Sequence, residues 1–314
     1  MATTPPPTAE PTGEPTGELD PDQLDAVREA LLGWFGRARR PLPWRSTRDP
    51  YHVLVAEVLA QQTQAERAAT AFDRFLARFP TVEALAASTP AEVLREWQGL
   101  GYNRRALALR AAAAAVVAAA GGWPATVEGL RALPGVGPYT ARAVACFAYE
   151  QDVAPVDTNV ARVLARALLG ADPAGLSPGA RQAVADAALP PGGAWAWSSA
   201  LMDLGTAHCR AKPRCDGCPL VTRCAWHALG PDAPLPAPRR TGPFASSDRR
   251  WRGAVVRVLA ADHEHLGLDE AALAEAVDAA AAKRPPGWFG DLLGRLRAEG
   301  LVDLDGDGRY RLPS

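Results

Sequence analysis

Residues 133–140 read LPGVGPYT, a turn with glycines at 135 and 137 that precedes a helical pattern. Two glycines between apolar stretches allow the backbone to take positive φ and to approach a partner closely, and the next helix is expected to begin at about Gly137 or Pro138. The free N–H groups at such a helix start attract anions, phosphate above all. The octamer alone is equally compatible with an ordinary corner between two helices, so the rest of the chain has to decide.

Composition predicts a globular protein with one core and an appended part. The chain has 314 residues, of which 48% are hydrophobic, and its formal net charge is −1. No apolar run reaches the roughly 18 residues of a membrane span. Residues 1–20 lack a basic region and an apolar run, which argues against a signal peptide, and their Pro, Thr, Gly and Glu content predicts a disordered acidic tail. We therefore expect a cytoplasmic protein that has no contact with a membrane.

Apolar residues recur at helical spacing along most of the chain, and no strand pattern appears before its C-terminal part. Helices are expected at 21–39, 51–62, 64–79, 103–120, 138–149, 157–169, 179–188 and 195–207. This pattern predicts an all-α core over residues 21–228. Residues 229–248 are predicted to be a Pro-rich linker. Residues 249–314 contain three further helical patterns and the hairpin-like LVDLDGDGRYRL, the order of a winged helix.

Four cysteines give the most specific local signal. Cys209, Cys215, Cys218 and Cys224 follow the pattern C-x5-C-x2-C-x5-C within the loop 209–224. In a cytosolic chain, closely spaced thiols predict a metal centre rather than disulfides. The two candidates are a [4Fe–4S] cluster and a structural Zn²⁺ ion, and the presence of a single C-x2-C favours the cluster. The fifth cysteine, Cys146, lies at an apolar helical position and is expected in the core.

Basic residues are unevenly distributed, although the net charge is close to zero. Residues 207–252 contain nine Lys or Arg residues and three Asp, whereas the first 20 residues contain only acids. A local basic face is therefore available for a polyanion such as DNA. The same pattern is also common on ordinary solvated surfaces.

Taken together, three motifs resemble the helix-hairpin-helix DNA glycosylase superfamily, which includes endonuclease III and the MutY-type adenine glycosylases. The motifs are the turn LPGVGPYTARA, the aspartate of PVDTNVARVLAR and the four-cysteine loop, and the likeness runs from about Leu24 to Trp226. PWRSTRDPYHVLVAEVLAQQTQAER and LREWQGLGYNRRALAL are similar to the MutY branch in particular. The resemblance implies a two-lobed glycosylase core with an iron–sulfur loop, and double-stranded DNA with a mispaired or damaged base as the partner of a monomer.

Excision of a base requires a proton for the leaving base and a negative charge near the sugar, and two carboxylates in different environments can supply them. Glu57 lies in the apolar segment VLVAEVLA, where partial burial favours a proton donor. Asp157 precedes a helical pattern, whose N-terminal N–H groups favour an ionised carboxylate. Each residue also has a purely structural interpretation, a buried salt bridge for Glu57 and a helix cap for Asp157.

Tyr139 stands where members of this superfamily that also cut the strand have a lysine, which attacks the sugar to form a Schiff base. The chain contains only two lysines, Lys212 and Lys283, and neither precedes the four-cysteine loop. The sequence therefore predicts hydrolysis by water without strand cleavage. The hairpin would then anchor DNA, with the backbone amides around Gly135, Val136 and Gly137 on a phosphate.

The resemblance also implies which residues enter the duplex and line the base pocket. Gln61 and Gln62 follow Glu57 by one helical turn and can hydrogen-bond to base edges, while Tyr102 can wedge between bases. Arg45, next to Trp44, is similar to a wall of the pocket for the flipped base. Glutamine pairs and single tyrosines are also ordinary surface residues, and an arginine stacked on a tryptophan is a common packing arrangement.

Three departures from the MutY pattern bear on the substrate. Ser199 stands where many MutY-type enzymes have a Gln or Glu that helps bind adenine, the first cysteine gap is one residue shorter than usual, and residues 249–314 are too few and too helical for a Nudix-like domain. The sequence predicts a monofunctional base excision repair glycosylase for adenine opposite 8-oxoguanine or guanine. The alternatives are a uracil or thymine mismatch glycosylase and a non-catalytic iron–sulfur DNA-binding protein.

Overall fold

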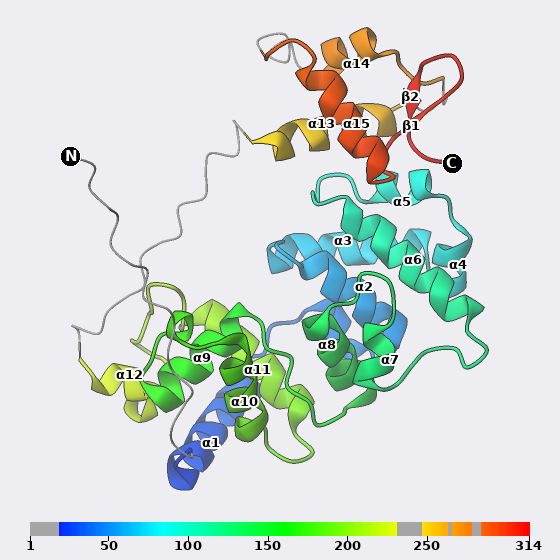
Figure 1. The fold of residues 1–314 in the computed structure, drawn as a ribbon. Coiled ribbons are helices and arrows are strands. Elements are labelled where there is room, and N and C mark those ends of the chain that lie inside the picture. Colours follow the sequence, from blue (N-terminus) through cyan, green and yellow to red (C-terminus); the bar gives the residue numbers. More distant parts are fainter. Residues whose placement is uncertain (1–18, 231–246, 263–265, 278–283) are drawn as a thin grey trace, which may run out of the picture. The chain divides into compact units, whose positions relative to one another are not determined.

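A computed structural model describes residues 19–230, 247–262, 266–277 and 284–314 of the chain. Most of the predicted tail and linker lies outside these residues. Helices dominate the described residues (Figure 1), which confirms the prediction of a mostly helical protein. None of the described helices is both long and apolar enough to cross a membrane.

The chain divides into two compact units, each built from two stretches of sequence. Unit 1 comprises residues 1–41 and 138–238, and unit 2 comprises residues 42–137 and 239–314. The boundary after residue 137 falls within the glycine turn that precedes the helix at Pro138.

Unit 1 contains six helices among its described residues: α1 (Pro21–Ala38), α8 (Pro138–Tyr149), α9 (Thr158–Leu169), α10 (Pro178–Ala188), α11 (Ala194–Ala207) and the short α12 (Ala225–Ala228). Single 3₁₀ turns occur at Pro173–Gly175 and Val221–Arg223. Leu31, Leu164, Trp197 and Leu204 are buried in one core that α1, α9, α10 and α11 share. Apolar residues at helical spacing on these helices therefore build the unit, as the sequence predicted.

The glycosylase-like part of unit 2 begins with a 3₁₀ turn, Pro43–Ser46. It continues with α2 (Pro50–Ala60), α3 (Ala65–Arg78), α4 (Val82–Ala87), α5 (Pro90–Glu96), α6 (Arg104–Ala118) and α7 (Val127–Arg131). The helices α4 and α6, and likewise α2 and α3, pack against each other. The Ala-rich α6 can approach its neighbours closely because buried Ala106, Ala112 and Ala113 occupy little space.

The C-terminal part of unit 2 consists of α13 (Asp248–Ala260), α14 (Glu270–Val277), α15 (Trp288–Ala298), β1 (Asp303–Leu304) and β2 (Tyr310–Arg311). The two strands are antiparallel, with Asp303 opposite Arg311, and an isolated bridge joins Leu268 to Tyr310. The helix α13 packs against both α14 and α5. The Ala91 amide donates to the Pro313 carbonyl oxygen at 3.0 Å, so the end of the chain is attached to α5 of the same unit.

Candidate active site and four-cysteine loop

The glycine turn is shaped by a close approach to α6. Gly135 has a φ of 74°, a backbone conformation that favours glycine. A Cβ atom at this position would lie 2.5 Å from the Ala108 Cβ atom, whereas a Cβ atom at Gly137 would meet nothing within 4 Å. The two glycines therefore serve different purposes: Gly135 permits the packing of the turn on α6, and Gly137 leaves its outer side open.

The amides of the turn correct one of the predicted anion contacts. The Val136 N–H donates to the Leu133 carbonyl oxygen at 3.1 Å, and the Val136 side chain is buried, so this amide is already used inside the turn. In the described part of the chain, the amides of Gly135 and Gly137 donate to no other backbone group. The N–H groups left for an anion are therefore those of Gly135 and Gly137, which flank Val136.

Gly135→Ala is expected to lower the free energy of unfolding by about 1–3 kcal/mol, because the new methyl group meets Ala108 and alanine disfavours positive φ. Gly137→Ala is the matched control and should change stability by less than about 0.5 kcal/mol. Urea denaturation of the parent and both variants would measure the difference. Equal stabilities would show that the turn does not depend on this contact.

Glu57 lies on α2, whose N-terminal end is attached to unit 2 by two hydrogen bonds. The Asp49 side chain caps the helix through the Tyr51 amide at 2.8 Å, and the buried Tyr51 hydroxyl donates to the Phe79 carbonyl oxygen at 2.7 Å. Glu57 is half-buried, while its neighbours Ala56 and Val58 are buried. The structure thus places this carboxylate at the margin of an apolar core, as the sequence predicted.

Gln61, Gln62 and Tyr102 lie together in unit 2, and an arginine that sequence reasoning missed holds them there. Arg105 Nη1 donates to the Gln61 carbonyl oxygen at 2.6 Å, and Nη2 donates to the Gly101 carbonyl oxygen at 3.1 Å. Its guanidinium carbon lies 5.6 Å from the centre of the Tyr102 ring. Burial lowers the pKa of the Arg105 guanidinium from its usual value. Arg105 therefore ties the end of α2 to the loop that carries Tyr102.

The backbone presents two of these residues in an unusual way. Tyr102 has a φ of 48° and Gln62 a φ of 54°, values uncommon for residues other than glycine. Tyr102 is also 46% exposed, which is high for a large aromatic side chain. Positive φ at non-glycine residues persists only where the surroundings impose it, and such strain concentrates at functional sites.

Arg45 and Tyr139 occupy other places. Arg45 is half-buried in the 3₁₀ turn of unit 2, beside Trp44, whose ring packs edge-on against Phe72 at 5.8 Å. Arg45 does not line the groove that contains Gln61, Gln62 and Tyr102. Tyr139 is half-buried on the first turn of α8 in unit 1.

Asp157 caps α9 in unit 1, as predicted. Its Oδ1 atom accepts from the Val160 amide at 2.7 Å, and its Oδ2 atom accepts from the Asn159 side-chain amide at 3.1 Å. The cap was expected to dominate the ionisation of this group. Instead, burial raises the pKa of the Asp157 carboxyl above its usual value, although these hydrogen bonds oppose the shift. Desolvation outweighs the helix terminus, so the carboxylate is a destabilised anion.

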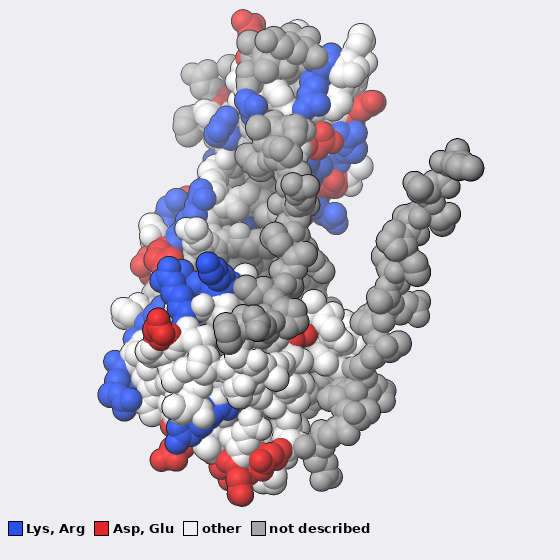
Figure 2. All heavy atoms as spheres, turned by 90° about the vertical axis from the view of Figure 1, so that its left-hand side faces the viewer, with Lys and Arg blue, Asp and Glu red and all other residues white. Residues whose placement is uncertain are grey.

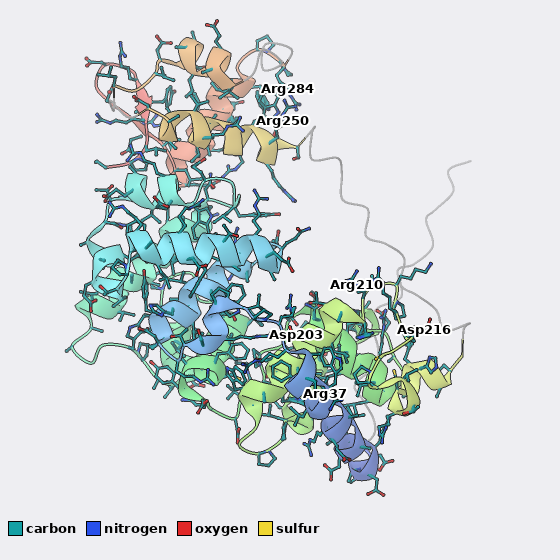
Figure 3. All side chains as sticks on the ribbon, turned by 180° about the vertical axis from the view of Figure 1, so that it is seen from behind. Arg37, Asp203, Arg210, Asp216, Arg250 and Arg284 are labelled. Carbon is teal, nitrogen blue, oxygen red and sulfur yellow. The ribbon has the colours of Figure 1, made fainter. Side chains whose placement is uncertain are left out.

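Asp203, in the segment LMDLG at residues 201–205 of α11, has a structural role in unit 1. Asp203 is 1% exposed, and its Oδ1 atom accepts from Arg40 Nε at 2.6 Å. The pair attaches the chain after α1 to α11, where Figure 3 labels Asp203. Ser199 lies one turn earlier on α11 and is also buried.

The four cysteines gather at one end of unit 1 and form no disulfide. Cys209, Cys218 and Cys224 pack against the core of the unit. Burial raises the pKa of the Cys218 thiol to about 11, and the charges of the other three cysteines add to the effect. Burial likewise raises the pKa of Cys224, with contributions from Cys209 and Cys215. Among the described residues, no group of three or more His, Cys, Asp or Glu side chains is arranged so that it could hold a metal ion.

Arg166 on α9 holds the start of this loop through hydrogen bonds, a role that no sequence motif indicated. The side chain is 1% exposed, donates from Nη1 to the Arg210 carbonyl oxygen at 2.6 Å and from Nη2 to the Ala211 carbonyl oxygen at 3.1 Å. Its Nη1 atom lies 3.8 Å from Cys209 Sγ, and its guanidinium lies 5.1 Å from the Trp226 ring centre. Figure 3 labels Arg210 and Asp216 in this loop.

Known proteins resemble this chain over nearly its whole length. An adenine DNA glycosylase of Mycolicibacterium smegmatis is 40% identical over 285 residues, which is 90% of this chain and 94% of that protein. An adenine DNA glycosylase of Mycobacterium tuberculosis is 42% identical over 289 residues, 90% of this chain and 92% of that protein. Residues 55–174 match the family model of the HhH-GPD superfamily base excision DNA repair proteins.

The chain belongs to the HhH-GPD superfamily and, within it, to the adenine DNA glycosylase branch. This confirms the family predicted from the glycine turn, Asp157 and the cysteine loop. The matched segment of the HhH-GPD model includes Glu57, Tyr102 and Asp157. Residues 249–314 make up more than a tenth of the chain, so a match over 90% of it extends into the C-terminal part of unit 2.

Solved structures share the fold. A thermostable thymine-DNA glycosylase is 29% identical, with a TM-score of 0.62 over 67% of this chain and 98% of that one. An endonuclease III in a non-covalent DNA complex is 24% identical, with a TM-score of 0.59 over 68% of this chain and 98% of that one, and this likeness concerns the fold alone.

Proposed function

We propose that this protein is a monofunctional DNA glycosylase that removes adenine mispaired with 8-oxoguanine or guanine. The observation that carries the proposal is the 40% identity to an adenine DNA glycosylase over 90% of this chain, because a match of that extent spans both acids and extends into the C-terminal part of unit 2. Acids in two different environments support the same conclusion. Glu57 borders an apolar core, and Asp157 is held at a helix cap.

In the proposed reaction, Glu57 donates a proton to the leaving adenine while the bond between its nitrogen and the sugar C1′ breaks. The Asp157 carboxylate stabilises the positive charge that develops on the sugar, and a water oxygen then bonds to C1′ and loses a proton. Burial supports this role, because it makes the Asp157 anion costly until a cation lies beside it. The Tyr139 phenol cannot form a Schiff base, so the product is an abasic site.

The remaining predicted residues would hold the DNA. Gln61, Gln62 and Tyr102 line one groove and would enter the duplex beside the flipped nucleotide. The amides of Gly135 and Gly137 would bind a phosphate at the start of α8, and Arg45 would line the base pocket. The C-terminal elements α13 to β2, with the bridge at Leu268, follow the order of a winged helix, and we assign that fold to them. The protein is expected to act as a monomer.

We propose that Cys209, Cys215, Cys218 and Cys224 hold a [4Fe–4S] cluster, because the loop supplies four thiols close together. Burial and the charges of neighbouring cysteines raise the pKa of the Cys215, Cys218 and Cys224 thiols, and a positive metal centre would remove the cost of their ionisation. Arg166 donates toward Cys209 and would offset the charge of the thiolates. When bound, the cluster would supply cross-links that keep the loop folded, and no step of base excision requires it.

Purified protein is expected to contain about four iron atoms per chain and to absorb broadly near roughly 400 nm. Cys215→Ser should remove most of the iron, while Cys146→Ala, which changes a buried cysteine outside the loop, should keep it. Metal analysis by mass spectrometry measures both. If the protein is colourless and contains about one zinc per chain, the metal centre is a structural Zn²⁺ ion and not the cluster.

A panel of duplexes tests the function directly. Each duplex would contain one mispair, A:8-oxoG, A:G, U:G or T:G. Each reaction would be analysed with and without alkali. Cleavage of the adenine strand only after alkali is the expected result. The likeness to a thymine-DNA glycosylase makes T:G and U:G the informative alternatives. Cleavage confined to those duplexes would show that the protein excises thymine or uracil. Intact DNA in all four duplexes would show that the protein binds DNA without excising a base.

A further inference from the structure

The groove that contains Gln61, Gln62 and Tyr102 is also rich in arginines, and most of these have no role in the function proposed above. It has a volume of about 1260 Å³ and runs between α13 and the loop 98–103 that carries Tyr102. Seven arginines line it, four of them on α13, and none of its described lining residues is acidic. Figure 2 shows Lys and Arg side chains in several groups on the C-terminal helices, at the top of that view. A groove of this charge suits a polyanion.

Strained residues of the candidate site open into the same groove. Gln62 and Tyr102 are two of the three non-glycine residues with positive φ in the described part of the chain, and both line it. An arginine of α13 reaches across to one of them: Arg249 Nη1 donates to the Tyr102 hydroxyl oxygen at 3.0 Å, with its guanidinium 5.7 Å from the ring centre. Arg105 lies 5.6 Å from the same ring centre. Tyr102 therefore has an arginine from each of two helices as a neighbour.

The face of α13 in the groove is open as well as basic. Arg249, Gly253 and Arg257 are spaced four residues apart and lie on one side of the helix, and all three line the groove. A Cβ atom at Gly253 would meet nothing within 4 Å, so packing inside the protein does not require a glycine there. Glycine weakens a helix interior, and its use is explained where another backbone must approach closely. Arg257 is exposed and makes no ion pair with a described residue.

The interactions of the other arginines in the groove indicate which guanidinium groups are available to a ligand. Arg252 pairs with Glu299, and Arg105 is occupied by backbone carbonyl oxygens. Arg250 stacks on the buried Trp251 at 5.0 Å, and Figure 3 shows it at the same end of the C-terminal helices as Arg284. Arg249 and Arg257 are thus the two α13 arginines that best combine exposure with a position on the open face.

We propose that this groove binds the phosphate backbone of duplex DNA beside the base being excised, and that Arg249 positions Tyr102 in its wedging conformation. The proposal rests on the proposed function for the identity of the duplex. Guanidinium groups bind phosphate in a planar, paired geometry, and Gly253 allows the strand to lie against the helix. The C-terminal helices are then part of the DNA-binding surface.

The phosphate contacts are tested by the salt dependence of binding to an undamaged duplex. Arg249→Ala and Arg257→Ala should each reduce the slope of log K against log salt by about 1 and weaken binding about tenfold near 0.1 M salt. Arg297→Ala removes an exposed arginine of α15 outside the groove and should leave the slope unchanged. Slopes for Arg249→Ala and Arg257→Ala equal to that of Arg297→Ala would overturn the proposal.

Shape is tested separately from charge. Gly253→Leu should weaken binding by about tenfold and leave the melting temperature equal or higher, because leucine is the better helix former. Gly294→Leu is the matched control, since Gly294 is also a mid-helix glycine with nothing within 4 Å of a Cβ and lies outside the groove. A Gly253→Leu variant that is stable and binds as the parent does would show that no strand lies on this face.

The positioning of Tyr102 by Arg249 is tested by a measurement that the loss of a positive charge alone would not change. In single-turnover excision, Arg249→Ala and Tyr102→Phe should slow the reaction by similar factors, and the double variant should be no slower than either one. Additive losses would separate Arg249 from Tyr102. A parent that excises no base while the salt slopes still fall would reject the proposed function and keep the groove. Active enzyme with unchanged slopes would do the reverse.

Discussion

Glu57→Gln and Asp157→Asn are each expected to lower single-turnover excision by about 10²–10⁴-fold, and neither is expected to unfold the protein. Each change removes one ionisable oxygen and keeps the shape of the side chain. Affinity for a duplex should stay within about threefold of the parent, because phosphate contacts supply most of the binding energy. Glu29→Gln provides the control, since Glu29 is an exposed carboxylate on α1.

Asp157→Asn separates catalysis from structure because asparagine caps helices as well as aspartate does. The asparagine side chain can still accept a hydrogen bond from the Val160 amide, which lies 2.7 Å from Asp157 Oδ1 in the parent. It loses the hydrogen bond from the Asn159 amide to Oδ2, and this loss offsets the gain from removing a buried charge. The free energy of unfolding should therefore change by no more than about 1 kcal/mol. Asp157→Ala loses the cap too and should cost about 1–2 kcal/mol.

The raised pKa of Asp157 fixes the sign of a pH effect. Above the folded-state pKa the carboxyl is ionised in both states, and burial then penalises only the folded protein. As the pH falls through the raised pKa toward the ordinary value of 3.8, the folded state takes up the proton first and the penalty disappears. The stability of Asp157→Asn relative to the parent should thus be greatest above the raised pKa and should decrease as the pH falls through it, as measured by urea unfolding.

Retention of full activity by either variant would contradict the proposed mechanism. A variant that loses activity together with duplex binding would point instead to a damaged fold, which circular dichroism and the melting temperature would reveal. The informative result is a folded, binding protein that leaves adenine in place. In that case Glu57 and Asp157 act on the bond itself.

Long helices with strong apolar periodicity were predictable from the sequence. The helix predicted at 138–149 is α8 with the same ends, and the helix predicted at 157–169 is α9, with Asp157 as its cap. The short helices α4, α5 and α7 were missed because they contain only five to seven residues, fewer than two turns. Their threonine caps were visible signals, above all the capping box formed by Thr89 and Glu92.

The candidate site was predictable where the chemistry lies in local motifs and not where it depends on distant contacts. The cap at Asp157 and the turn at Gly135 follow from neighbouring residues. Arg105 and Arg166 lie in helical patterns that contain several arginines, and packing alone decides which of them turns inward. Arg105 reaches Gln61 across 44 residues of sequence, and Arg166 reaches Arg210 across the same separation.

Arg166→Ala is expected to lower the free energy of unfolding of unit 1 by about 3–5 kcal/mol, because it removes a buried charge whose partners then stay behind. The carbonyl oxygens of Arg210 and Ala211 would lose their donors, and Asp172 would lose a cation 3.6 Å away. The Trp226 ring would lose the guanidinium that lies against it. Urea unfolding followed by far-ultraviolet circular dichroism measures the loss.

Two further variants separate the guanidinium from its charge and from the loop as a whole. Arg166→Lys keeps a cation but cannot serve two carbonyl oxygens and an aromatic face at once, so it should lose about 1–3 kcal/mol. Arg223→Ala removes an exposed arginine of the same loop and should change stability by less than about 0.5 kcal/mol.

Iron content gives the same comparison a second measure. Arg166 donates to the backbone at residues 210 and 211 and lies 3.8 Å from Cys209 Sγ, so it sets the position of the first cysteine relative to the other three. Arg166→Lys should therefore retain less iron than Arg223→Ala even where both are folded. If Arg166→Ala matched Arg223→Ala in its free energy of unfolding and in its iron content, the cysteines alone would hold the loop. The buried Arg166 side chain would then contribute nothing to it.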